Sequence, residues 1–133
     1  MVIDTSIAVA WCFEDESSPA TDNILAQVSQ EGGIVPPLWR YEIANALLTA
    51  RKRKRLTETD AQRFLGLLSS LPLEVDADIP DAAALLAASQ LHGLSAYDSA
   101  YLLLAQRHGL ELATLDAPLA KAARAAGVSV VPG

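Results

Sequence analysis

Short apolar runs alternate with longer amphipathic stretches along the whole chain, and this alternation constrains the fold more than any other feature. The short runs predict strands at residues 1–3, 34–35, 73–75, 110–115 and 128–131. Strands separated by roughly ten or more helical residues run parallel, and the crossovers between them are almost always right-handed. The sequence therefore predicts an α/β fold, a three-layer α/β/α sandwich with a mainly parallel sheet of about five strands.

The stretches between these runs carry apolar residues three and four positions apart, which predicts helices. The predicted helices cover about residues 7–11, 19–30, 38–50, 58–70, 81–92, 95–108 and 117–126. Thr5 or Ser6 is expected to cap the first helix, and Ser18 the second. His92 and His108 each precede a glycine, an arrangement typical of a helix end.

The chain of 133 residues has the size of one domain, so we expect residues 1–133 to form a single unit. Its hydrophobic residues, 51% of the total, can build a core without a disulfide or a structural metal. Asp4 interrupts the apolar run that a signal peptide needs, and no stretch approaches the ~18 apolar residues of a membrane span. We expect a cytoplasmic protein in which the one cysteine, Cys12, is a buried or half-buried apolar residue.

The charges are unevenly distributed, with 16 acidic and ten basic residues and a net charge of −6. Five bases are consecutive at residues 51–55, which leaves five bases against 16 acids elsewhere. An acidic chain repels nucleic acid on average, so a polyanion would have to be recruited by a bound cation or by the basic run. The run lies at a predicted helix end. It either complements the helix dipole or contacts phosphate, with Arg51, Lys52 and Arg55 as candidates.

Two carboxylates directly follow predicted strands. Asp4 ends the first strand, and Asp116 comes after residues 110–115. Because the carboxyl ends of parallel strands meet at one edge of the sheet, where ligands bind in α/β folds, both side chains can share one cleft. Each position is also typical of a helix cap, which requires no ligand.

Two further acids lie in the first turns of predicted helices. Glu42 is followed by Asn45 on the same helix face, and such pairs are common on protein surfaces. Asp98 lies three residues after Ser95, a spacing that resembles a capping box and is favourable without any catalysis. Spacing alone leaves these structural roles open beside a functional one.

A cluster of these four carboxylates would need a partner. Two carboxylates ~4 Å apart repel by ~4 kcal/mol at an effective dielectric of about 20, so the cluster would have to bind protons or hold a cation. Oxygen ligands favour Mg²⁺ or Mn²⁺ over zinc. Such a site suits phosphodiester hydrolysis, because the ion activates water and neutralises charge on the departing oxygen.

Four short motifs contain the candidate acids. They are VIDTS at residues 2–6, PLW at 37–39 with Glu42 and Asn45 behind it, YDSAY at 97–101 and LATLD at 112–116. In this order and spacing they resemble a PIN domain, specifically the VapC-type toxin ribonucleases, and the resemblance extends over residues 1–131. It implies a parallel three-layer fold, RNA cleavage with Mg²⁺ or Mn²⁺, a homodimer and a VapB-type antitoxin as partner.

The resemblance also implies which residues form the site. The acids of the family match Asp4, Glu42, Asp98 and Asp116, which would be the metal ligands and the catalytic residues. Its supporting hydroxyl and amide positions match Ser6, Asn45 and Thr114. No acid of the family pattern is missing.

Two other classes of function fit the same carboxylates. One is a receiver-like signalling module phosphorylated on Asp4 or Asp116, although the acidic pair and the lysine of such modules are not evident. The other is a non-catalytic binding domain whose acids keep it soluble. Trp11 and Trp39 are expected in the core or at an interface.

Overall fold

All five strands of the computed structural model run parallel, in the order β3-β2-β1-β4-β5. The structure describes residues 1–133. In chain order its elements are β1 (Val2–Ile3), α1 (Thr5–Cys12), α2 (Pro19–Glu31), β2 (Gly33–Val35), α3 (Leu38–Lys52), α4 (Glu58–Ser70), β3 (Leu73–Val75), α5 (Ala82–His92), α6 (Ala96–His108), β4 (Leu112–Ala113), α7 (Ala117–Ala125) and β5 (Val130–Val131).

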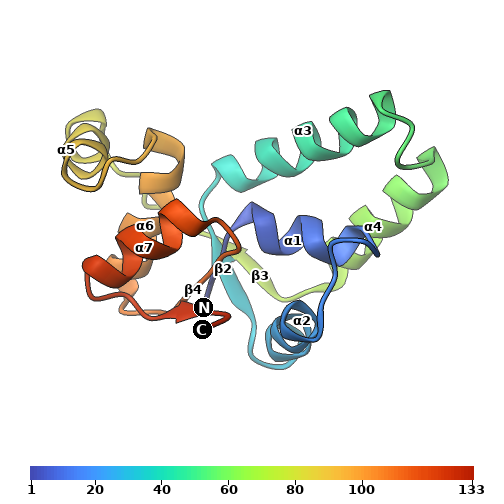
Figure 1. Cartoon of the computed structure of the whole chain (residues 1–133), viewed down its shortest axis with the longest axis horizontal. Coiled ribbons are helices and arrows are strands. Elements are labelled where there is room, and N and C mark those ends of the chain that lie inside the picture. The colour runs from blue at the N-terminus through green and yellow to red at the C-terminus, as the bar shows by residue number, and fades with distance from the viewer.

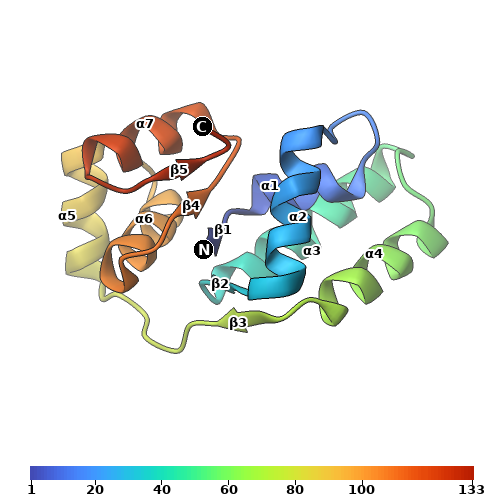
Figure 2. The ribbon, with the colours of Figure 1, turned by 90° about the horizontal axis from the view of Figure 1, so that it is seen from below.

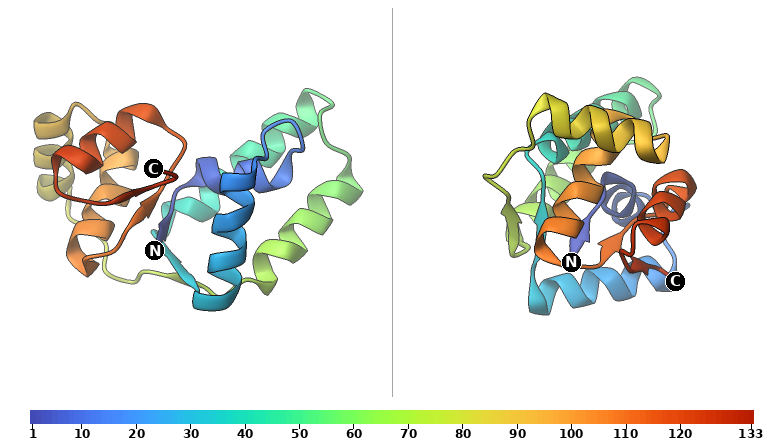
Figure 3. Two further views of the ribbon diagram at one scale, coloured as in Figure 1. Left: turned by 60° about the horizontal axis from the view of Figure 1, so that its bottom comes forward. Right: turned by 90° about the vertical axis from the view of Figure 1, so that its left-hand side faces the viewer.

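Helices cover both faces of the sheet. Helices α5, α6 and α7 lie on one side and α1 to α4 on the other (Figures 1 and 2). Helix α6 packs against β1 and β4, and α5 packs against α6. Helices α3 and α4 form a hairpin that extends away from the sheet (Figure 3). The predicted three-layer α/β/α sandwich with a parallel five-stranded sheet is confirmed.

Two predicted strands are shorter than expected. Residues 110–115 contribute only β4, and residues 128–131 only β5. Two of these residues end the preceding helices instead, because the backbone N–H of Leu110 bonds to Ala105 at the end of α6 and that of Val128 to Ala123 at the end of α7. These two residues therefore do not extend the strands.

The predicted cap of the first helix is wrong. Asp4 occupies the N-cap position of α1, Thr5 is already helical, and no side chain caps this helix. The other caps follow the prediction: Ser18 forms a capping box at the start of α2, and Gly93 and Gly109 adopt left-handed conformations after α5 and α6. The hydroxyls of Thr5 and Ser6 are therefore available for other partners.

The predicted core residues are largely buried. Trp39 is buried, with an indole N–H that has no hydrogen-bond partner, and Trp11 donates to the carbonyl of Thr21 at 2.9 Å. Cys12 is half-buried, and its burial, followed by the nearby charges of Asp60 and Glu16, raises the pKa of its thiol. This favours the unreactive thiol form. None of the helices combines the length and the apolar character needed to cross a bilayer.

Candidate active site

Asp4 lies where the connections of the sheet change direction. From β1 the chain continues to β2 and β3 on one side, and it then returns to β4 and β5 on the other. In α/β folds, ligands bind at such a switch point, beyond the carboxyl ends of the strands. Asp4 follows β1 and its backbone N–H donates to Ala113 in β4 at 3.0 Å. Because Asp116 follows β4 within three residues, the structure brings both acids to the same edge.

Two hydroxyls hold one oxygen of Asp4. Ser6 Oγ and Thr114 Oγ1 each donate to Asp4 Oδ2 at 2.7 Å, a length typical of charge-assisted bonds. The backbone N–H groups of Leu115 and Asp116 donate in turn to these two hydroxyl oxygens, at 2.9 and 3.0 Å. Only 6% of Asp4 is exposed, and its Oδ1 accepts no hydrogen bond from the chain. The predicted support by Ser6 and Thr114 thus corresponds to direct contacts.

Glu42 is held in the same manner from different elements. It lies in the second turn of α3, where its Oε1 accepts from Tyr101 Oη of α6 at 2.6 Å and from Thr5 Oγ1 of α1 at 3.0 Å. Burial of Tyr101, followed by its bond to Glu42, raises the pKa of the phenol far above its ordinary value. Tyr101 therefore remains a proton donor while the protein is folded.

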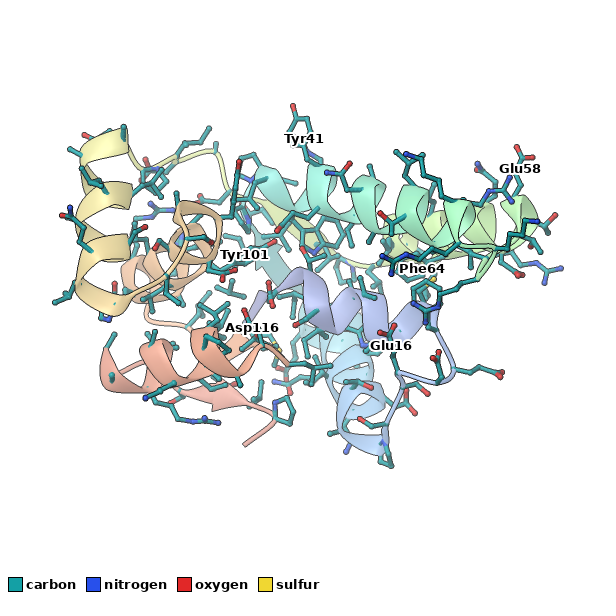
Figure 4. The ribbon with its side chains drawn as sticks, turned by 45° about the horizontal axis from the view of Figure 1, so that its top comes forward. Glu16, Tyr41, Glu58, Phe64, Tyr101 and Asp116 are labelled. Atoms are coloured by element: carbon teal, nitrogen blue, oxygen red, sulfur yellow. The ribbon has the colours of Figure 1, made fainter.

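Thr5 and Tyr101 were not among the predicted site residues. Both lie inside the motifs that contain the acids, Thr5 directly after Asp4 and Tyr101 one helical turn after Asp98. Spacing of three on α6 places Tyr101 and Asp98 on the same side of the helix, and this is the signal that could have found it. Figure 4 shows Tyr101 and Asp116 in the central region between the two groups of helices, with Tyr41 on the outer side of α3.

Asp98 and Asp116 lie at helix N-termini without serving as caps. Ser95 caps α6 by accepting from the backbone of Asp98 at 3.1 Å, but the Asp98 carboxylate does not return a bond to complete a capping box. Asp116 is the N-cap residue of α7, yet its side chain makes no capping bond. Positive helix N-termini favour both carboxylates there. Neither carboxylate makes a capping hydrogen bond, so the interaction with the helix dipole is the structural role that remains for them.

Three of the four acids act on the fourth, Asp98. Burial of Asp98, followed by the negative charges of Asp116, Asp4 and Glu42, raises its pKa from 3.8 to about 6. All ion pairs of the chain lie elsewhere, on Arg55, Arg107 and His108. The negative charge of these four acids is therefore uncompensated by the chain itself, and a bound cation would relieve it.

The donor set fits a hard divalent ion. Asp4 and Glu42 each present one held and one free oxygen, and carboxylate oxygens are the ligands that Mg²⁺ and Mn²⁺ prefer. As they stand, the side chains form no group of three or more acidic, histidine or cysteine residues that could hold a metal ion. Mg²⁺ typically keeps several waters and takes one or two protein carboxylates. Simultaneous coordination by all four acids stays a prediction.

Asn45 is placed differently from the other predicted supports. It is exposed on α3, and its amide makes no hydrogen bond to Glu42. Its support of the site stays a prediction.

The basic run begins in the last turn of α3, as predicted, and continues into the turn at the tip of the α3–α4 hairpin. Helix α3 ends at Lys52, and Lys54 has a positive φ of 57° in the turn that follows. Arg55 pairs with Asp15 at 3.3 Å and lies over the ring of Phe13, 4.4 Å from its centroid. Arg51 donates to a backbone carbonyl at 3.4 Å. Arg55 thus joins the tip to the loop after α1, whereas Lys52 is exposed.

Comparison with known proteins places this geometry in context. The family model of the PIN domain matches residues 1–125. The chain is 31% identical over 125 residues to Ribonuclease VapC3 of Pyrobaculum aerophilum. The aligned region covers 91% of this chain and 92% of the relative. It is also similar to the crystal structure of PAE2754 from Pyrobaculum aerophilum, with a TM-score of 0.73 and 26% identity, over 98% of this chain and 89% of the other.

Proposed function

The chain belongs to the PIN-domain family and is related to its VapC-type ribonucleases, and from this we propose that it is the toxin of a type II toxin–antitoxin pair. In this proposal it is an endoribonuclease that hydrolyses RNA phosphodiester bonds. Residues 1–133 form one nuclease domain that depends on Mg²⁺ or Mn²⁺. The metal site and the catalytic site are formed by Asp4, Glu42, Asp98 and Asp116.

One observation supports the proposal: the charges of Asp116, Asp4 and Glu42 reach Asp98, and no cation of the chain pairs with any of the four acids. A non-catalytic binding domain that used these acids only for solubility would have no need to bury Asp4 or to hold its Oδ2 with two hydroxyls. A receiver-like module is not retained, because the PIN domain accounts for residues 1–125.

The residues divide the work according to their contacts. Asp4 and Glu42 provide fixed oxygens, because hydroxyls immobilise one oxygen of each carboxylate and leave the other for a cation. Asp98 and Asp116 have no such hydroxyl partners and complete the negative site from the N-termini of α6 and α7. When bound, a divalent ion supplies charge neutralisation at the phosphodiester and lowers the pKa of the attacking water. The products are a 5′-phosphate and a 3′-hydroxyl.

The proposed partners follow from the family relationship. They are an RNA substrate in the cytoplasm, a second copy of the chain and a VapB-type antitoxin. Exposed apolar side chains, among them Ile79, Leu86 and Leu91 on and next to α5, are available to a protein partner. Sedimentation of the purified chain, alone and with its antitoxin, measures both associations.

We also propose that the basic run contacts RNA phosphate, mainly through Arg51 and Lys52. Arg51 lies nine residues beyond Glu42 on α3, which places it about 14 Å farther along the helix axis. A strand that leaves the site along α3 would reach Arg51 and Lys52 first. Arg55 contributes less to such a contact, because Asp15 and Glu16 already pair with it.

The proposal is tested by an end-mapped digest of total RNA with and without Mn²⁺. We expect the parent protein to cleave only with the ion, and Asp98→Asn and Asp4→Asn to lose at least a hundredfold in rate. Asp22→Asn is the matched control, because Asp22 also lies in the first turn of a helix but is exposed on α2. The digest also reveals the RNA target.

A folded Asp98→Asn or Asp4→Asn protein that cleaves RNA as fast as the parent would refute the catalytic assignment. Calorimetry that detects no specific Mn²⁺ binding to the parent would instead favour a non-catalytic binding domain.

A further inference from the structure

The core of the protein contains a tyrosine whose hydroxyl is directed at the proposed site. Tyr101 is fully buried and is the largest side chain of the chain to be so. Its neighbours in the core are apolar residues of α6, β1 and β4, yet its hydroxyl reaches Glu42 Oε1 at 2.6 Å. A buried hydroxyl needs a partner, and a carboxylate is the strongest acceptor that a neutral donor can find.

A second hydroxyl completes the arrangement around the same oxygen. Thr5 Oγ1 donates to Glu42 Oε1 at 3.0 Å, and it lies 2.9 Å from the hydroxyl of Tyr101. An ionised carboxylate only accepts hydrogen bonds, so both hydroxyl hydrogens can be directed at Oε1. Oε2 accepts no hydrogen bond from the chain, and it is left as the free oxygen of Glu42.

The arrangement at Glu42 matches the arrangement at Asp4. Ser6 and Thr114 occupy Asp4 Oδ2 as Thr5 and Tyr101 occupy Glu42 Oε1. Thr5 and Ser6 are consecutive at the start of α1, so one helix end supplies a hydroxyl to each carboxylate. Glutamate has one more rotatable bond than aspartate, and its side chain loses more rotamer freedom when it is fixed. A rigid, buried partner is therefore most useful at Glu42.

We propose that Tyr101 is a positioning residue of the active site, which together with Thr5 fixes Oε1 of Glu42 and leaves Oε2 for the divalent ion. The inference rests on the proposed metal-dependent function. Tyr101 is too deeply buried to contact RNA, so it acts through Glu42 alone. Partners of this kind, which orient a metal ligand, typically contribute about 10–100-fold to metal affinity or activity.

The test measures Mn²⁺ affinity by calorimetry and RNA cleavage as a function of Mn²⁺ concentration. Tyr101→Phe keeps the buried ring and removes only the hydroxyl. We expect it to weaken Mn²⁺ binding about tenfold or more, to shift the Mn²⁺ requirement for cleavage by the same factor, and to leave the KM for RNA unchanged. Tyr97→Phe is the matched control, because it removes the same hydroxyl from an exposed position on the same helix.

Thr5 provides a second, smaller perturbation that does not depend on the core. Thr5→Val should weaken Mn²⁺ binding, and Thr5→Ser, which keeps the hydroxyl, should restore it. A purely structural role would lower the melting temperature of Tyr101→Phe without changing the Mn²⁺ affinity of the folded protein.

The outcomes separate this inference from the proposed function. If the parent binds Mn²⁺ and cleaves RNA, but Tyr101→Phe and Thr5→Val bind Mn²⁺ as tightly as the parent, the positioning role is overturned. The proposed nuclease function is still supported in that case. If the parent binds no Mn²⁺, the proposed metal site and this inference fall together.

Discussion

Replacement of Asp98 by asparagine should stabilise the metal-free protein near neutral pH, although it removes a residue of the proposed site. Burial and the charges of Asp116, Asp4 and Glu42 raise the pKa of Asp98 from 3.8 to about 6. An acid with a raised pKa in the folded state favours folding only while it is protonated. Its contribution is lost as the pH rises from 3.8 to about 6, and above that range the folded protein bears the full cost of the charge.

The magnitude follows from the same two values. The interval from 3.8 to about 6 corresponds to roughly 3 kcal/mol at about 1.36 kcal/mol per pH unit. Asp98 is only partly buried, and solvent screening reduces this value. Loss of the favourable interaction with the N-terminus of α6 removes a further 0.3–1 kcal/mol or so. We therefore expect Asp98→Asn to raise the free energy of unfolding by about 1 kcal/mol above pH 7.

Urea denaturation at several pH values between 3.5 and roughly 8, in the presence of a chelator, measures this difference. The stability of the parent relative to Asp98→Asn should fall between pH 4 and about 6 and stay constant above. Asp22→Asn, at the exposed first turn of α2, should show no gain at any pH. If Asp98→Asn is less stable than the parent at pH 7 and above, the carboxylates do not repel one another as the structure implies.

Addition of Mn²⁺ should reverse the order of the two proteins. A ligand that binds only the folded state stabilises it by about 2.7 kcal/mol at a hundred times its dissociation constant. The parent gains this stabilisation, whereas Asp98→Asn has lost a carboxylate of the site. A parent that is not stabilised by Mn²⁺ would contradict the proposal.

Two further predictions concern the contacts around the site and the hairpin tip. Thr114→Val should lower the free energy of unfolding by about 1–3 kcal/mol, because it removes one hydrogen bond to the buried Asp4 carboxylate. It should also weaken Mn²⁺ binding. Urea denaturation and calorimetry measure the two effects, and an unchanged free energy of unfolding would refute the role of that hydrogen bond. Arg55→Ala should lower the free energy of unfolding by no more than about 1 kcal/mol, with a smaller loss at high salt, because it removes an exposed pair with Asp15. By contrast, Lys52→Ala should leave stability unchanged and reduce the salt dependence of RNA affinity, measured by filter binding.

The positions of the acids could be predicted from the sequence because they depend on local rules. Asp4 follows an apolar run and Asp98 follows a serine by three residues, and these patterns identify a strand end and a helix start without any knowledge of the rest of the chain. Parallel strands then place the residues after β1 and β4 at one edge. The fold and the location of the candidate site follow from this reasoning.

The partners of the acids could not be predicted in the same way. Local rules suggested that Thr5 caps α1, but its hydroxyl bonds to Glu42 and contacts Tyr101, a residue 96 positions away. Only the packing of α6 against β1 brings that phenol to the start of α1. In the basic run, the pairing of Arg55 depends likewise on a distant segment, the loop after α1 that contains Asp15.

The placement of the paired charges says more about the site than the net charge of −6 does. The ion pairs involve other acids: Arg55 pairs with Asp15 and Glu16, and Arg107 pairs with Asp76, which directly follows β3. None of the four buried or half-buried site acids has a cationic partner in the chain, although burial makes an unpaired carboxylate more costly there than on the surface. The proposed divalent ion would offset this cost at the four site acids, as arginine does at Asp15 and Asp76.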